Sequence, residues 1–155
     1  MDILPRISTV IIANGRFPSH PLPLSLIERA EYIVCTDGAA NDFIAHGGRP
    51  DAIVGDCDSV SEENRLLYAH ILHRDPDQET NDLTKSVHFC VKNGRKEIVI
   101  VGGTGYREDH TLGNISLLAD YMEEATVEMY TNYGIFTPMR GSVEFSSFPG
   151  QQVSL

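Results

Sequence analysis

The feature that most restricts the fold of this chain is the regular alternation of short apolar runs with helical segments. Most of the apolar runs are rich in β-branched residues, as in strands buried on both faces. They cover Thr9–Ala13, Tyr32–Cys35, Ala52–Val54, Ile71–His73, Glu97–Val101 and Thr126–Tyr130. The helical segments are Leu24–Ala30, Ala39–His46, Ser61–Ala69, Asn81–Asn93 and one that carries Leu112, Ile115, Leu118 and Met122. Alternating strands and helices build βαβ crossovers. We therefore predict an α/β fold: a mainly parallel, Rossmann-like sheet with helices on both faces.

Prolines and capping residues predict where some helices and loops begin and end. Pro18, Pro21 and Pro23 indicate a stiff, irregular loop after the first strand. Ser59 and Glu62 have the spacing of a capping box before the third helix.

The sequence pattern changes at Gly134. From there to Leu155, glycines and prolines separate short runs such as Ser142–Ser146, which alternate as a strand does. We predict two units: an α/β domain over residues 1–133, and the first strands of an antiparallel β-sandwich domain over 134–155. The second unit is too short to cover its own apolar residues. We therefore expect either a dimer formed through this unit or a chain shortened from a longer parent.

Composition excludes several classes of partner. The 155 residues carry a net charge of −10, which disfavours a nucleic-acid or anionic-membrane surface. No apolar stretch has the length of a membrane span. The three cysteines have no metal-ligand spacing, and we expect no signal peptide, because no basic segment followed by an apolar run precedes the first strand. We expect a cytoplasmic protein with reduced thiols.

Polar residues gather just after the predicted strands. These residues are Asp37, then Asp56 and Asp58, then Asp75, Asp77, Gln78 and Asp82, and finally Thr104, Arg107, Asp109 and His110. The carboxyl ends of parallel strands share one edge of a sheet, where ligands bind. Alternate residues of an extended chain point the same way, so we expect Asp56 and Asp58 to face one point. The alternative is a solvated acidic turn.

Mg²⁺ is the cation that suits these groups, because it takes oxygen ligands and often shares them with phosphates. We predict that Asp56, Asp58 and Asp82 bind Mg²⁺. Lys85 shares a helix face with Asp82 and reaches either a phosphate or only Asp82. The glycines of Gly102–Gly105 allow backbone N–H groups to approach an anion. Asp109 either orients Arg107 or caps the following helix.

Four stretches together resemble the thiamine pyrophosphokinase family. They are Thr36–Asn41, Pro50–Ser59, Asp77–Lys85 and Gly102–Asn114, and the match extends to about Tyr133. The resemblance implies transfer of a diphosphate from ATP to the hydroxyl of thiamine, with Mg²⁺, by a homodimer whose C-terminal β domain helps to hold thiamine. By position, the resemblance assigns catalytic roles to Asp37, Asp56, Asp82 and Arg107. It assigns substrate or nucleotide binding to Asn41, Gln78, Lys85, Thr104, Asp109, His110 and Asn114.

Two other functions remain open at this point. Asp56-Cys57-Asp58 is also the pattern of a phosphatase that forms an aspartyl-phosphate. A third possibility is a module that binds nucleotide without turning it over.

Overall fold

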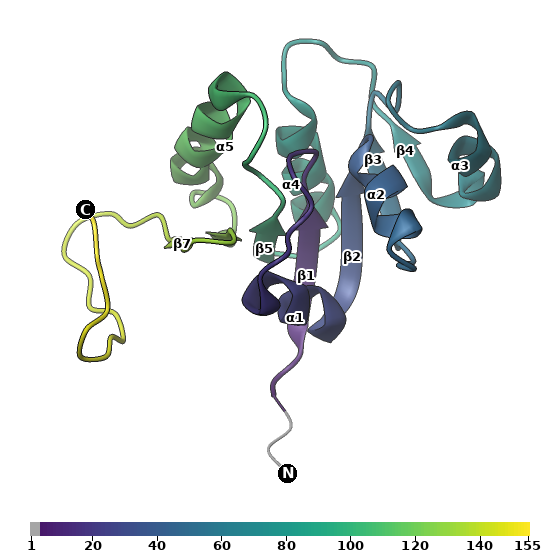
Figure 1. Ribbon diagram of the computed structural model, residues 1–155. Coiled ribbons are helices and arrows are strands. Elements are labelled where there is room, and N and C mark those ends of the chain that lie inside the picture. The colour runs from purple at the N-terminus through teal and green to yellow at the C-terminus, as the bar shows by residue number, and fades with distance from the viewer. Residues whose placement is uncertain (1–3) are drawn as a thin grey trace.

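The computed structural model describes residues 4–155. The strands are β1 (Ile7–Ile12), β2 (Ala30–Thr36), β3 (Ala52–Gly55), β4 (Leu72–Arg74), β5 (Glu97–Val101), β6 (Thr126–Tyr130) and β7 (Ile135–Phe136). The helices are α1 (Pro21–Arg29), α2 (Ala39–Ala45), α3 (Glu62–Leu67), the short 3₁₀ helix η1 (Ala69–Ile71), α4 (Asp82–Lys92) and α5 (Glu108–Tyr121). Strands and helices alternate as the sequence predicts (Figure 1).

The strands form one sheet in the order β4-β3-β2-β1-β5-β6-β7. Every pair is parallel except β6 with β7. The chain builds outward from β1 to β4 and then returns to pair β5 with the free side of β1. The strand order therefore reverses between β1 and β5, and the crevice at the carboxyl ends of these two strands is where such sheets bind ligands.

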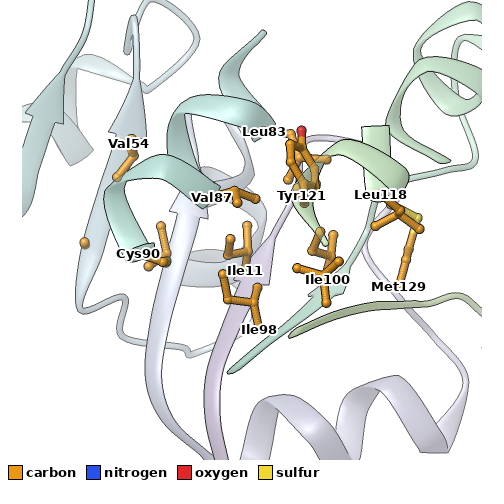
Figure 2. Packing of buried hydrophobic residues seen from close by; sticks show 14 residues of the cluster. Ile11, Val54, Leu83, Val87, Cys90, Ile98, Ile100, Leu118, Tyr121 and Met129 are labelled. Atoms are coloured by element: carbon orange, nitrogen blue, oxygen red, sulfur yellow. The ribbon is translucent and has the colours of Figure 1, made fainter. Parts of the chain in front are cut away.

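Two apolar layers hold helices on opposite faces of the sheet. Side chains of β1 alternate between the layers: Ile11 packs with α4 and α5, whereas Val10 and Ile12 pack with α1 and α2. Figure 2 shows the first layer, where Leu83, Val87 and Cys90 of α4 lie against the strands. Their spacing places them on one face of the helix, which fixes α4 and the residues at its start.

Two expectations about helix starts are wrong. Helix α1 begins at Pro21 instead of Leu24, and Pro23 lies in its first turn rather than in a loop. Proline is tolerated there because first-turn N–H groups have no helical partner. The cap of α3 is Ser61, whose hydroxyl accepts from Asn64 N at 3.2 Å, and not Ser59.

Beyond β6 the chain adds little regular structure. Strand β7 pairs antiparallel to β6 through two residues. The segment Ser142–Ser146, expected as a strand, forms none, and a strand needs a partner for its backbone groups. Residues 137–155 leave the sheet as an irregular segment that doubles back on itself (Figure 1), with Phe145 and Phe148 exposed.

Candidate active site

The floor of the site is made by two loops at the point where the strand order reverses. Gly15, after β1, donates from its N–H to Gly102 O at 2.7 Å, and Arg16 N–H donates to Thr104 O at 2.8 Å. A Cβ at Gly15 would lie 2.5 Å from both of these carbonyl oxygens. The loops are therefore joined so closely that residue 15 must be glycine. This contact places the glycine-rich segment after β5 beside the end of β1.

Three carboxylates meet at the same edge of the sheet. Asp37 follows β2, Asp56 follows β3, and Asp82 begins α4; one ligand oxygen from each lies within 4.8 Å of the others. Gly55 permits this approach, because a Cβ there would lie 3.1 Å from the Asp82 carboxylate. Its φ of 142° is also one that other residues rarely adopt.

The cluster carries unbalanced negative charge in a partly dry environment. Asp37 is only 4% exposed. Burial, followed by the charges of Asp82 and Asp56, raises the pKa of Asp37 to about 6, although the N–H of Ser59 donates to it at 3.2 Å. Burial and the same carboxylates raise the pKa of the Cys57 thiol to about 11. Crowded carboxylates of this kind favour a bound cation.

Asp58 lies outside this cluster, so the expectation that it faces the same point as Asp56 does not hold. Cys57 adopts a left-handed φ of 63°, which breaks the alternation of an extended strand. Asp58 N–H instead donates to Asp56 Oδ1 at 3.0 Å, and its exposed carboxylate lies 3.8 Å from Arg74. Asp37 takes the third position of the cluster.

A cleft of about 560 Å³ adjoins the cluster through Asp56 and Asp82, whereas Asp37 does not line it. It is lined by most of the residues that the sequence analysis selected: Asp56, Gln78, Asp82, Lys85, Thr104, Arg107, Asp109, His110 and Asn114. Asn41 does not line it. The Asn41 side chain instead joins α2 to the start of α3, donating to Ser59 O at 2.8 Å and accepting from Ser61 N–H at 3.0 Å.

Several cleft residues hold others in place. Asn114 donates to Gly103 O at 2.9 Å and so fixes the glycine-rich loop. Asp109 accepts two bonds from the Arg107 guanidinium, at 3.1 Å and 2.7 Å. This pairing lowers the pKa of Asp109. Of the two roles expected for Asp109, the structure favours orienting Arg107, since α5 has no side-chain cap bond.

Sequence reasoning passed over some residues of the cleft. Asn14, Thr80 and Thr111 line it but were not selected. Asn14 had one usable indication, because it directly follows a buried strand, as Asp37 and Asp56 do. Thr80 and Thr111 lie within stretches that resemble the family, but their position alone gave no reason to select them, because it depends on how the loop and helix around them turn.

Comparison with known proteins identifies the family. The profile described as "Thiamin pyrophosphokinase, catalytic domain" matches residues 24–131, well over half of the chain. The chain belongs to the thiamin pyrophosphokinase family. The matched segment includes the acidic cluster, the glycine-rich loop and most residues that line the cleft.

Individual relatives agree with this assignment. A thiamine pyrophosphokinase 1 of Oryza sativa subsp. japonica is 34% identical over 152 residues, covering 82% of this chain and 57% of its own length. A thiamin pyrophosphokinase 1 of Caenorhabditis elegans is 33% identical over 111 residues, covering 66% of this chain and 45% of its own. The crystal structure of thiamine pyrophosphokinase from Bacillus subtilis is 26% identical, with a TM-score of 0.63 over 79% of this chain and 60% of that one.

This member of the thiamin pyrophosphokinase family spans about half the length of these two sequence relatives. Among the residues that the structure describes, no helix has both the length and the apolar character needed to cross a bilayer.

Proposed function

We propose that this chain carries the catalytic domain of a thiamine diphosphokinase, an ATP-dependent diphosphotransferase. In the proposed reaction the hydroxyl oxygen of thiamine forms a bond to the β-phosphorus of ATP. The bond from that phosphorus to the oxygen bridging to the α-phosphate breaks, the hydroxyl proton is lost, and thiamine diphosphate and AMP leave. The observation that carries the proposal is the cluster of Asp37, Asp56 and Asp82 at the carboxyl edge of the parallel sheet, in a chain of this family.

The donor set suits Mg²⁺. Asp37, Asp56 and Asp82 offer only carboxylate oxygens, which are hard ligands, and their mutual repulsion falls when a cation binds. These three residues would hold the ion, which neutralises phosphate charge when bound. We do not include Asp58 in this first set, because its carboxylate is turned toward Arg74.

The remaining cleft residues position the triphosphate. Backbone N–H groups of the glycine-rich loop and the start of α5 favour an anion on the side opposite the carboxylates. Arg107, held by Asp109, adds a cationic fork at the mouth of the cleft. Gln78, Thr104 and His110 also line the cleft, and we propose that they contact the substrates. Catalysis would then consist mainly of orientation and charge neutralisation.

The test is incubation of the chain with ATP, Mg²⁺ and thiamine, with chromatographic measurement of AMP and thiamine diphosphate. AMP that appears only with thiamine supports the proposal. Phosphate release without thiamine would instead indicate the phosphatase, and nucleotide binding without any product would indicate the binding module. A thiamine analogue without the hydroxyl, a sample with EDTA and the Asp56→Asn variant serve as controls.

The proposal extends to the segment 134–155. We propose that it begins the β domain that helps to hold thiamine, and that two copies of the protein form a homodimer through this unit. Support comes from β7, which starts an antiparallel pairing, and from exposed apolar side chains such as Phe145 and Phe148. Calorimetry should show tighter binding of a Mg²⁺–nucleotide analogue than of thiamine. A monomer that binds thiamine tightly would contradict this part.

A cytoplasmic location is part of the same proposal. Its support is that Cys35, Cys57 and Cys90 are free and buried, as is usual for proteins kept in a reducing compartment.

A further inference from the structure

Lys85 is the one buried cationic side chain among the described residues, with 3% of its side chain exposed. An ammonium group has three N–H donors and no acceptor. Lys85 Nζ donates to Asp75 O at 2.9 Å, to Asp77 O at 2.5 Å and to Asp82 Oδ1 at 3.3 Å. All three donors therefore have partners inside the chain, which leaves none for a phosphate.

Two of these partners belong to the loop between β4 and α4, residues 75–81, which arches over the strand ends (Figure 1). Every residue of this loop is exposed. It is anchored at its start by Asp75 N–H, which donates to Gly55 O at 2.7 Å, and at its end by Asn81, which caps α4.

Between these anchors the loop is bonded mostly to itself. Asp77 accepts from Glu79 N–H at 3.2 Å and from the Thr80 hydroxyl at 2.8 Å. Within the described part of the chain, the bond from Lys85 to Asp77 O is the one that joins residues 76–80 to the rest of the protein. The position of this loop over the cleft therefore depends on Lys85.

We propose that Lys85 is a positioning residue, and not a phosphate ligand: its ammonium group holds the 75–81 loop and the Asp82 carboxylate in one fixed arrangement. This inference rests on the proposed function for the identity of the ligand. Residues 77, 78, 80 and 81 line the cleft on one side, and Asp82 belongs to the acidic cluster below. A single buried side chain thus links the wall of the cleft to the acidic cluster.

Burial explains why a lysine suits this position. An ammonium group out of water needs hydrogen-bond acceptors and a negative charge nearby, and the two carbonyls and Asp82 supply both. The charge also offsets part of the repulsion within the cluster before any cation arrives. A side chain that merely contacted phosphate would need an exposed tip, which Lys85 lacks.

The experiment measures hydrogen exchange of residues 75–81 in the free protein, without nucleotide or thiamine. In Lys85→Met, which keeps an unbranched side chain, we expect the loop amides to exchange roughly tenfold faster or more, because charge-assisted bonds are lost. The affinity for a non-hydrolysable Mg²⁺–ATP analogue should fall in parallel. Lys85→Arg, which keeps charge and donors, should restore part of the protection.

Lys92→Met is the matched control, because Lys92 lies on the same helix but is exposed; it should leave loop exchange unchanged. If Lys85→Met does not fold, Lys85→Gln keeps two N–H donors without the charge and should give intermediate exchange. Loop exchange that is unchanged in the folded variant, together with lost nucleotide affinity, would overturn the inference and make Lys85 a phosphate contact. The hydrogen-exchange experiment contains no substrate. Its result therefore tests the role of Lys85 independently of the AMP assay, which tests the proposed function.

Discussion

Replacing Asp37 by Asn should stabilise the metal-free protein while removing its response to Mg²⁺. Asn keeps the oxygen that accepts the N–H of Ser59. It also tolerates the left-handed backbone at this position, where φ is 45°. The substitution therefore removes one buried negative charge from the cluster with little other change.

The size of the effect follows from the pKa of Asp37. Burial and the neighbouring carboxylates raise it from 3.8 to about 6. At 1.36 kcal/mol for each pKa unit, ionised Asp37 lowers the free energy of unfolding by at most about 3 kcal/mol near neutral pH. For a domain of this size, about 3 kcal/mol corresponds to a gain in Tm of up to roughly 6–12 °C for the variant.

The sign of the pH dependence gives a second measurement. The folded-state pKa is above the ordinary value, so the stability that Asp37 contributes is complete below pH 3.8 and is lost as the pH rises through about 6. In EDTA, the gain in free energy of unfolding from Asp37→Asn should therefore be largest at pH 7.5 and fall to about half that value at pH 5.

The assay is thermal unfolding at both pH values, in EDTA and in saturating Mg²⁺. Mg²⁺ should raise the Tm of the unmodified protein and leave that of the variant nearly unchanged. A variant less stable than the unmodified protein in EDTA at pH 7.5, or an equal Mg²⁺ response in both, would refute the reasoning about the cluster.

Four further substitutions and one control test the rest of the site. Asp56→Asn should abolish both Mg²⁺ stabilisation and diphosphate transfer, whereas Asp58→Asn should retain Mg²⁺ stabilisation of the free protein, as metal-titrated unfolding can show. Arg107→Lys should lower kcat/KM for ATP roughly tenfold or more despite its unchanged charge, because an ammonium group lacks the planar guanidinium fork that binds two phosphate oxygens through parallel N–H groups; unaltered kinetics would place Arg107 outside the reaction. Gly15→Ala should cost about 1–3 kcal/mol in urea unfolding, because its methyl group would meet two carbonyl oxygens at 2.5 Å. The control Gly113→Ala, in helix α5 with open space around it, should instead gain about 0.5–1 kcal/mol.

The fold could be predicted almost completely from the sequence, because it depends on patterns that extend over many residues. The β-branched run Glu97–Val101 is strand β5 over those same residues. The helix expected over Asn81–Asn93 is α4 with its two caps. Single-residue features were less reliable: Ser59 and Ser61 both suit a cap, and only the path of the chain decides between them.

The sequence predicted where the acidic cluster lies, but not how its carboxylates are arranged. Position after a strand identified Asp37, Asp56 and Asp82, because the topology of a parallel sheet brings those positions together. The alternation of side chains in an extended chain failed to place Asp58, since the left-handed Cys57 changes the direction in which the next side chain points. The role of Lys85 was also beyond sequence reasoning, because its partners are carbonyls of a loop that has no repeating pattern.

The pairing of β1 with β5 has a consequence for the order of events during synthesis. Val10 pairs with Val99. One edge of β1 therefore has no partner strand until the ribosome has made the chain as far as β5. Until β5 arrives, β1 presents an apolar strand edge that can pair with other chains. The acidic residues are made early, whereas the glycine-rich segment that completes the floor comes late. We therefore expect nascent chains that stop before Glu97 to aggregate, and the cleft to form only in the last stage of folding.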